Sequence, residues 1–174
     1  EGKIQRITPR RNDLVNDTWM TDSGRELYKS VTSKDRILRP SVKGQDIPME
    51  HAIAAAFECL ENKKIGLVAS CKSTLEEQFL TKQLIVESNA RTYIRGHFGQ
   101  DDGILLSADR TPNLRGALIT GLTNDYPKGD LLDLNEAIAT GEVNALLVMG
   151  EDLLDSGISD ERSEEHTSEL QSPC

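Results

Sequence analysis

Residues 65–77 read IGLVASCKSTLEE and combine two signals that are typical of an α/β fold. The apolar run at its start is short and uninterrupted, as in a strand buried on both faces of a parallel sheet. Ser73 and Thr74 each stand three residues before a glutamate, which is the spacing of a capping box at a helix start. We therefore expect a strand over 65–70 and a well-buried helix from 73 to about 87.

The same alternation of helix and strand extends on both sides of this stretch. Ile53, Phe57 and Leu60 define the apolar face of an amphipathic helix, and Gly141 is placed to end a later helix in the left-handed conformation. Such a rhythm predicts a doubly wound parallel sheet. The expected helices cover 49–62, 73–87, 113–122 and 131–140, and the expected strands cover 65–70, 92–95 and 145–149.

The first 45 residues have a different character, with short alternating segments, turn clusters and the single tryptophan, Trp19, which we expect to anchor the packing. We therefore expect a small β-rich N-terminal remnant over 1–45. A partial doubly wound parallel sheet follows over 46–155, and a disordered tail follows over 156–174.

Composition excludes several classes of protein. The net charge of −9, from 20 basic and 29 acidic residues, argues against a nucleic-acid-binding module. No apolar run approaches the roughly 20 residues of a membrane span, so direct membrane insertion is not expected. Three cysteines without a C-x-x-C pair favour neither a disulfide framework nor a thiolate zinc site, and they suit a reducing compartment.

Three candidate catalytic features are visible, and each has a structural alternative. His97 lies in a glycine-rich loop with Asp101 and Asp102, a combination found in active sites and in ordinary loops. Cys71 follows a predicted strand beside a helix start, where a thiol can be activated, although a buried, inert thiol fits equally. His51 lies near the start of a predicted helix and is expected to face solvent.

An anion site is the candidate binding feature. The helix that begins near Ser73 could hold an anion at its N-terminus with help from Lys72. Neither a G-x-G-x-x-G fingerprint nor a Walker A sequence is present, so a simple capped helix is the alternative.

Residues 9–25 have the pattern P-R-x-N-x-x-V-N-x-x-W-x-x-D-x-G-R, which includes Val15-Asn16, Trp19, Asp22 and Gly24-Arg25. Later motifs are Arg39-Pro40, Ser70 to Glu77, Pro112-Asn113, Arg115-Gly116-Ala117, Ala137-Ile138 and Gly150-Glu151-Asp152-Leu153. Together these motifs resemble those of the molybdopterin oxidoreductase superfamily, in which an N-terminal 4Fe-4S segment ends in a pattern similar to residues 9–25. The resemblance is closest to the branch that forms the G subunit of NADH-quinone oxidoreductase (respiratory complex I).

Two departures from the family pattern bear on cofactors. Thr21 stands at the family's fourth cluster-cysteine position, and a threonine hydroxyl is a poor ligand for iron–sulfur iron. Ser23 stands where the family has a lysine between cluster and pterin. The resemblance therefore implies no catalytic residue, no metal ligand and no cofactor in this segment, with cofactor-binding residues unknown. The 4Fe-4S and 2Fe-2S clusters of the parent protein would lie upstream of Glu1.

Residues 162–174 resemble the conceptual translation of a sequencing adapter, so we expect them to be artefactual, with a natural acidic tail as the alternative. The resemblance implies a non-catalytic scaffold segment in an electron-transfer complex. Its partners would be other peripheral-arm subunits, in the cytoplasm and attached to the inner membrane through the complex. A piece of a molybdopterin-dependent, formate-dehydrogenase-like enzyme and a nucleotide-binding α/β module are the alternatives.

Overall fold

The computed structural model describes residues 2–34, 36–104 and 107–153. The chain divides into two compact units, residues 1–52 and 53–174. Within the described residues, no helix is long and apolar enough to cross a membrane. The expected tail over 156–174, including the adapter-like segment, lies outside the described residues.

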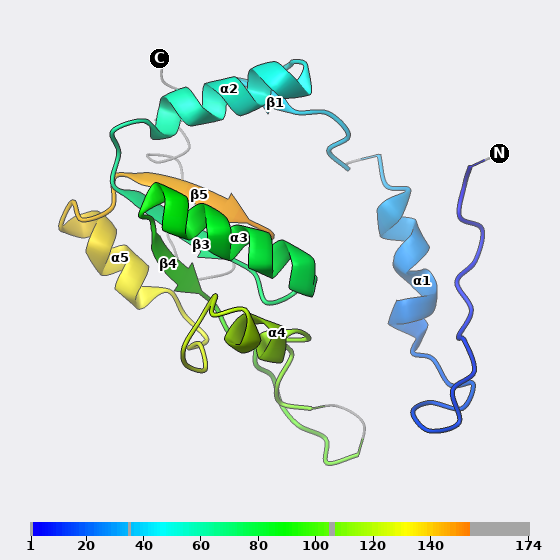
Figure 1. The fold of residues 1–174 in the computed structure, drawn as a ribbon. Helices are drawn as coiled ribbons and strands as arrows, with labels where there is room; N and C mark the ends of the chain where they lie inside the picture. Colours follow the sequence, from blue (N-terminus) through cyan, green and yellow to red (C-terminus); the bar gives the residue numbers. More distant parts are fainter. Residues whose placement is uncertain (1, 35, 105–106, 154–174) are drawn as a thin grey trace. The chain divides into compact units, whose positions relative to one another are not determined.

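A three-stranded parallel sheet forms the centre of the second unit (Figure 1). Its strands are β3 (Ile65–Ala69), β4 (Arg91–Ile94) and β5 (Ala145–Met149), and their order across the sheet is β4-β3-β5. Leu67 on the central strand lies opposite Thr92 on one side and Leu147 on the other. The parallel α/β class expected from the sequence is therefore confirmed.

Successive residues of β3 enter two different hydrophobic clusters, one on each face of the sheet. Leu67 belongs to the cluster that contains α3 (Leu75–Ser88) and α4 (Leu114–Ile119). Val68 belongs to the cluster that contains α5 (Leu132–Ala139). Because side chains alternate along a strand, this arrangement buries both faces, as a doubly wound sheet requires.

The helix that follows β3 begins with the predicted capping box. Of the two possible boxes, the structure uses the one from Thr74 to Glu77: the Glu77 amide donates to Thr74 Oγ1 at 3.3 Å, and the Thr74 amide donates to the Glu77 carboxylate at 2.8 Å. At the other end, Asn89 adopts the left-handed conformation with a φ of 52°. Gly141 ends α5 in the same conformation, as expected, with a φ of 69°.

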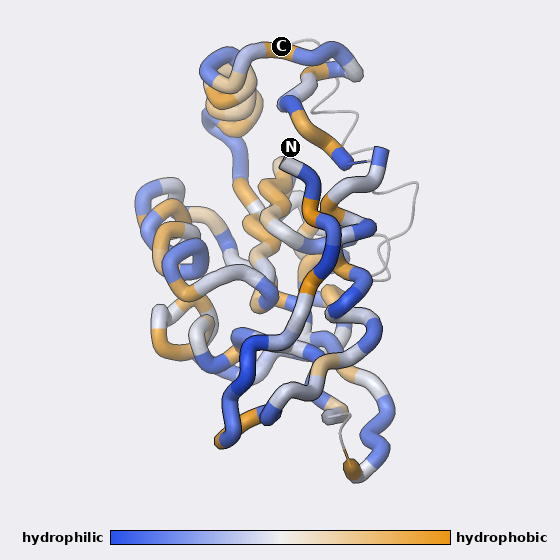
Figure 2. Tube along the Cα trace, turned by 90° about the vertical axis from the view of Figure 1, so that its right-hand side faces the viewer, coloured by the Kyte–Doolittle hydropathy of each residue, from blue (hydrophilic) through white to orange (hydrophobic). Residues whose placement is uncertain are grey.

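Two helices carry exposed apolar side chains, and for α3, which was expected to be well buried, this differs from expectation. Helix α2 (Met49–Leu60) is largely apolar (Figure 2), yet it has no buried residue, and Ile53 and Phe57 are 51% and 65% exposed. Helix α3 is not buried around its circumference either, because Phe79 and Leu80 are more than half exposed. Periodicity locates an apolar face but does not identify what covers it.

The first unit contains a short antiparallel pair, β1 (Ser41–Val42) with β2 (Gln45–Asp46), helix α1 (Asp22–Val31) and the beginning of α2. The alternating segment over 3–8 is not assigned as a strand. Trp19 was expected to anchor the packing of this unit but is 56% exposed. Its amide donates instead to the Asn16 carbonyl, while the Asn16 side chain donates to the Trp19 carbonyl.

Candidate functional site

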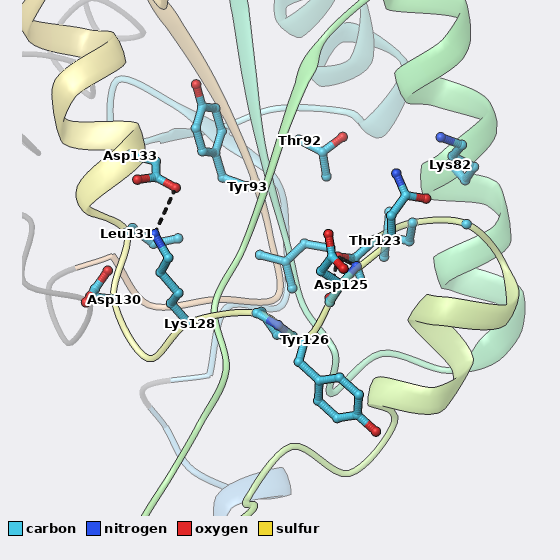
Figure 3. Close-up of a pocket in the computed structure, with 15 residues that line it drawn as sticks. Lys82, Thr92, Tyr93, Thr123, Asp125, Tyr126, Lys128, Asp130, Leu131 and Asp133 are labelled. Atoms are coloured by element: carbon cyan, nitrogen blue, oxygen red, sulfur yellow. Dashed lines mark hydrogen bonds and ion pairs between the residues drawn. The ribbon is translucent and has the colours of Figure 1, made fainter.

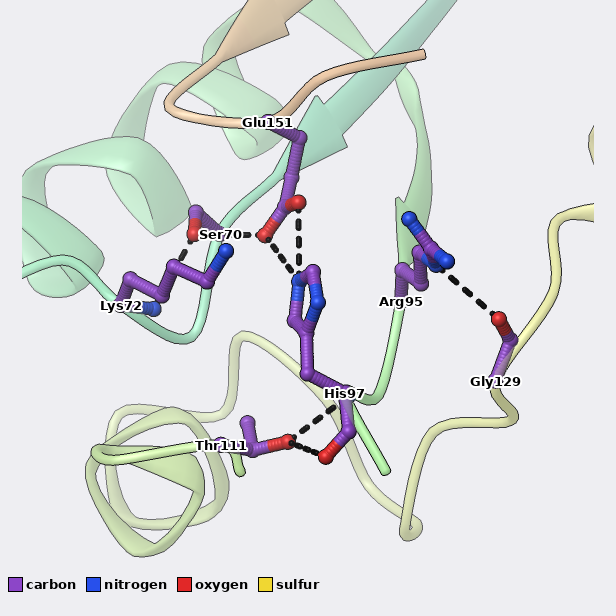
Figure 4. A network of polar contacts seen from close by, with 7 residues as sticks. All are labelled: Ser70, Lys72, Arg95, His97, Thr111, Gly129 and Glu151. Atoms are coloured by element: carbon purple, nitrogen blue, oxygen red, sulfur yellow. Dashed lines mark hydrogen bonds and ion pairs between the residues drawn. The ribbon is translucent and has the colours of Figure 1, made fainter. Parts of the chain in front are cut away.

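Three polar side chains meet where the parallel strands end (Figure 4). Ser70 follows β3, His97 follows β4, and Glu151 follows β5. Ser70 Oγ donates to Glu151 Oε1 at 2.7 Å, and His97 Nε2 lies 2.9 Å from Glu151 Oε2. The carboxyl edge of a doubly wound sheet is the place where such folds bind ligands, so this cluster occupies the expected site.

The Glu151 carboxylate is almost entirely enclosed. Its side chain is 1% exposed, and that of His97 is 14% exposed. An ionised carboxylate is costly to bury unless it is paired and hydrogen-bonded, and here both oxygens have a partner. Gly150 has a φ of 75° and lies directly against Ser70, since a Cβ added to Gly150 would be 3.2 Å from the Ser70 Cβ. This close approach brings the neighbouring Glu151 to Ser70.

This geometry is not that of an activated nucleophile. Nucleophilic catalysis needs a hydroxyl or thiol whose proton passes to an adjacent base. Ser70 Oγ instead contacts the carboxylate that also binds the histidine, so the carboxylate stands between the two. The Lys72 amide donates to Ser70 Oγ at 3.0 Å, which fixes the hydroxyl further. The cluster therefore cross-links the ends of three strands.

His97 also fixes the loop that follows β4. Its amide donates to Thr111 Oγ1 at 2.9 Å, and its carbonyl accepts from the Arg110 amide at 2.7 Å. Asp101 and Asp102 do not join His97 at the strand ends. Each accepts a hydrogen bond from a backbone amide two residues further along its own loop. The constellation expected from sequence is thus divided into a buried histidine and two exposed turn residues.

Cys71 is a buried thiol with an unfavourable environment for ionisation. It is fully enclosed, and desolvation raises its pKa from 9.0 to about 11, with further contributions from the negative charges of Glu151 and Asp109. A catalytic thiol needs the opposite shift. The inert alternative is therefore favoured over the nucleophile.

We expect Cys71 of the folded chain to resist iodoacetamide at pH 8. A pKa of about 11 leaves roughly a hundredfold less thiolate than an ordinary thiol has, and burial also blocks access. Peptide mapping by mass spectrometry measures the labelling rate, with the chain in urea as the control. Equal rates at Cys71 in the folded and unfolded chain would contradict this assignment.

The start of α3 is already satisfied by its own side chains. The Glu77 carboxylate accepts from the Thr74 amide, and Glu76 adds a second negative charge to the first turn. An incoming anion would be repelled by these carboxylates. The Lys72 side chain is exposed, and the simple capped helix is the alternative that the geometry supports.

Asn113 and Gly116, from the segment similar to the family pattern, build part of the core. The Asn113 amide group donates to the Ser73 carbonyl at 2.9 Å, and Gln78 Nε2 donates to the Asn113 carbonyl at 3.1 Å. Gly116 lies against both side chains, and a Cβ there would come within 2.6 Å of Gln78 Oε1. These contacts join α4 to α3, and their close packing explains why position 116 is a glycine.

Thr21 caps helix α1. Its Oγ1 accepts from the Gly24 amide at 3.1 Å and from Ser23 Oγ at 3.2 Å. Gly24 is helical, and a Cβ there would lie 3.1 Å from Thr21 Oγ1. A capping hydroxyl used in this way does not fit the role of an iron–sulfur ligand. Among the described residues, no group of three His, Cys, Asp or Glu side chains is arranged to hold a metal ion.

A separate cavity of about 470 Å³ lies beside β4 (Figure 3). Tyr93 comes from the strand, and most of the remaining wall comes from the segment that leads into α5. Lys128 Nζ lies 3.6 Å from Asp133 Oδ2 in this wall. The lining mixes charges of both signs and thus selects neither anions nor cations; its charged residues are Lys82, Lys128, Asp125, Asp130 and Asp133.

The central carboxylate was not singled out from the sequence as a site residue. Glu151 was named only as part of a family-like segment, and Ser70 only as the end of a strand and the start of another such segment. One signal could have identified the cluster: each of its residues lies at the end of a predicted strand of one parallel sheet or shortly after it. The carboxyl ends of parallel strands meet at one edge, so such residues are neighbours in space.

Comparison with known proteins gives partial matches. Over 153 residues the chain is 26% identical to the G subunit of NADH-quinone oxidoreductase from Pseudomonas fluorescens, an alignment that covers 87% of this chain and 15% of that protein. It is 33% identical over 98 residues to the Escherichia coli (strain K12) protein of the same name, covering 53% of this chain and 11% of that protein. It is 32% identical over 102 residues to the NADH-ubiquinone oxidoreductase 75 kDa subunit of Dictyostelium discoideum, and this alignment covers 53% of this chain and 15% of that protein.

No protein-family model matches the chain, and no solved structure matches it significantly. The chain thus corresponds to a small part of the relatives' length, between 11% and 15% in these three proteins. The similarity nevertheless extends over most of this chain in the longest alignment. The chain is therefore similar to a segment of the G subunit of NADH-quinone oxidoreductase.

Proposed function

We propose that this chain is a non-catalytic scaffold segment of a protein like the G subunit of NADH-quinone oxidoreductase. The observation that carries the proposal is the carboxyl edge of the sheet, where Ser70, His97 and Glu151 bind one another. A ligand at this edge would have to displace a buried carboxylate from both of its partners. Such a rearrangement is expensive, which favours a structural role.

Two further observations support a segment without a catalytic nucleophile or an iron–sulfur ligand. The Cys71 thiol is buried and its pKa is raised, so it is a poor nucleophile and a poor metal ligand at neutral pH. Thr21, at the position that the resemblance aligns with a cluster cysteine, caps α1 through its hydroxyl. In this proposal the iron–sulfur clusters belong to other parts of the parent protein.

The family resemblance described from the sequence motifs is the basis for the rest of the proposal. The partners would be other subunits of the peripheral arm, and the location would be cytoplasmic, attached to the inner membrane through the complex. The molybdopterin enzyme and the nucleotide-binding module receive no support from the contacts at Thr21 and Thr74, which are used internally.

Elemental analysis of the 174-residue chain, purified without oxygen and supplied with iron, sulfide and molybdate, tests this proposal. We expect substoichiometric iron and molybdenum, because no described side-chain group offers a complete ligand set. Ferredoxin treated in the same way is the positive control for cluster assembly. Iron or molybdenum at one or more atoms per chain would overturn the scaffold assignment.

A further inference from the structure

Polar and apolar residues are not segregated between the two sides of α3: Ile85 is buried in the core, but two polar residues are buried beside it and three large apolar residues are exposed. The helix turns Gln78 and Thr81 inward, and they are 1% and 5% exposed. Its outer side carries Phe79, Leu80 and Val86, which are 51%, 64% and 64% exposed. A helix on the surface of a sheet normally places its apolar side inward and its polar side in water. The exposed apolar residues of α3 therefore indicate a surface that is covered in the assembled protein.

The outer side of α3 continues onto α4 and forms a groove. Ile119 of α4 is 81% exposed and lies at the groove together with Leu75 and Phe79 of α3. The hollow has a volume of about 520 Å³, and we call it the α3–α4 groove. Its lining residues are Leu75, Glu76, Phe79, Leu80, Ile119 and Thr120.

We propose that the α3–α4 groove binds an amphipathic helix of a partner protein, with a lysine or arginine beside the helix's apolar stripe. The inference rests on the proposed scaffold function and names its docking face. Helices commonly bind to apolar grooves of this kind through side chains spaced three and four residues apart. The groove is apolar apart from Glu76 and Thr120, and a partner's cation would pair with that carboxylate.

Charge favours a basic partner helix over two other possible occupants of the groove, which are a second copy of the chain and an anionic membrane. Helices α3 and α4 together carry three glutamates against one lysine and one arginine, and the whole chain carries −9. A second copy of the chain would bring the same excess of negative charge to the groove, and like charges in contact are unfavourable. An anionic membrane surface would be repelled for the same reason. A basic helix is complementary in both polarity and charge.

Binding of two synthetic helices to the 174-residue chain tests the proposal. Both have about fifteen residues and the same leucine stripe, but one is filled with lysine and the other with glutamate. We expect the leucine–lysine helix to bind more tightly, and Phe79→Ser to weaken its binding by about thirtyfold, as at an interface hot spot. Tyr126→Ser, at an exposed aromatic residue outside the groove, is the matched control and should leave binding unchanged.

The charge requirement is tested at Glu76. Glu76→Gln should reduce the preference for the lysine helix, and Glu76→Lys should reverse it. If Glu76→Lys destabilises the first turn of α3, the result for Glu76→Gln decides whether the charge is required. If Glu76→Gln and the wild type prefer the lysine helix equally, the requirement for a basic partner is wrong. If Phe79→Ser binds the helix as tightly as the wild type, the helix does not bind at the α3–α4 groove.

Two other results also overturn the proposal. Self-association of the chain that depends on Phe79, seen by sedimentation, would identify a second copy as the occupant. Co-sedimentation with phosphatidylserine vesicles that depends on Phe79 would identify a membrane. Bound iron or molybdenum would contradict the scaffold function without changing these binding results, so the two failures are distinguishable.

Discussion

Replacing His97 with alanine should lower the free energy of unfolding by about 3 kcal/mol, because it leaves a buried carboxylate without its main partner. His97 Nε2 contacts both Glu151 oxygens, at 3.1 and 2.9 Å, and among the described residues only Ser70 would remain hydrogen-bonded to the carboxylate. Urea unfolding of the 174-residue chain measures the change. His51→Ala, at an exposed histidine on α2, is the matched control and should cost less than about 0.5 kcal/mol.

A second substitution separates the charge from the packing. Glu151→Gln in the His97→Ala background removes the buried charge and should recover roughly 1–2 kcal/mol of the loss, as a coupling energy between neighbouring groups. Equal stabilities of His97→Ala and the control would show that the carboxylate does not depend on the histidine. The assignment of the cluster as a cross-link between the strands would then be wrong.

Gly116→Ala should destabilise the chain by about 2 kcal/mol, although alanine normally stabilises a helix relative to glycine. The added methyl group would lie within 2.6 Å of Gln78 Oε1 and would also press on the Asn113 side chain. The hydrogen bond from Gln78 Nε2 to the Asn113 carbonyl would have to lengthen or break. Thermal or urea unfolding measures the loss.

Arg115→Ala, one residue earlier on the same helix and exposed, is the control and should be nearly neutral. A stabilising Gly116→Ala would mean that helix propensity outweighs the close packing. The explanation of this glycine by contact with α3 would then fail.

Much of the sheet could be predicted from the sequence because its signals are local. Uninterrupted apolar runs located β3 and β5, and the residues of the capping box located the start of α3. Gly141 marked the end of α5 by its left-handed conformation. Each of these signals arises from residues within one turn or one strand, so it can be recognised without tertiary information.

The remaining features depend on distant residues. His97 and Glu151 are 54 positions apart, and nothing in either local sequence specifies the contact. The expectation that α3 is well buried is wrong, because its apolar residues were assumed to meet the core of the same chain. Thr21 was interpreted as a lost ligand, whereas its capping role requires the geometry of α1.

The strand order β4-β3-β5 also determines when the nascent chain can complete its core during synthesis. The central strand pairs with β4 soon after both have been made, but Leu67 also needs Leu147, which follows 80 residues later. At about 5–20 residues per second, the ribosome needs several seconds to add the segment between β4 and β5. During that interval one edge of β3 and the apolar side chains beside it are open to other chains, so we expect chaperones to bind the nascent protein at this stage.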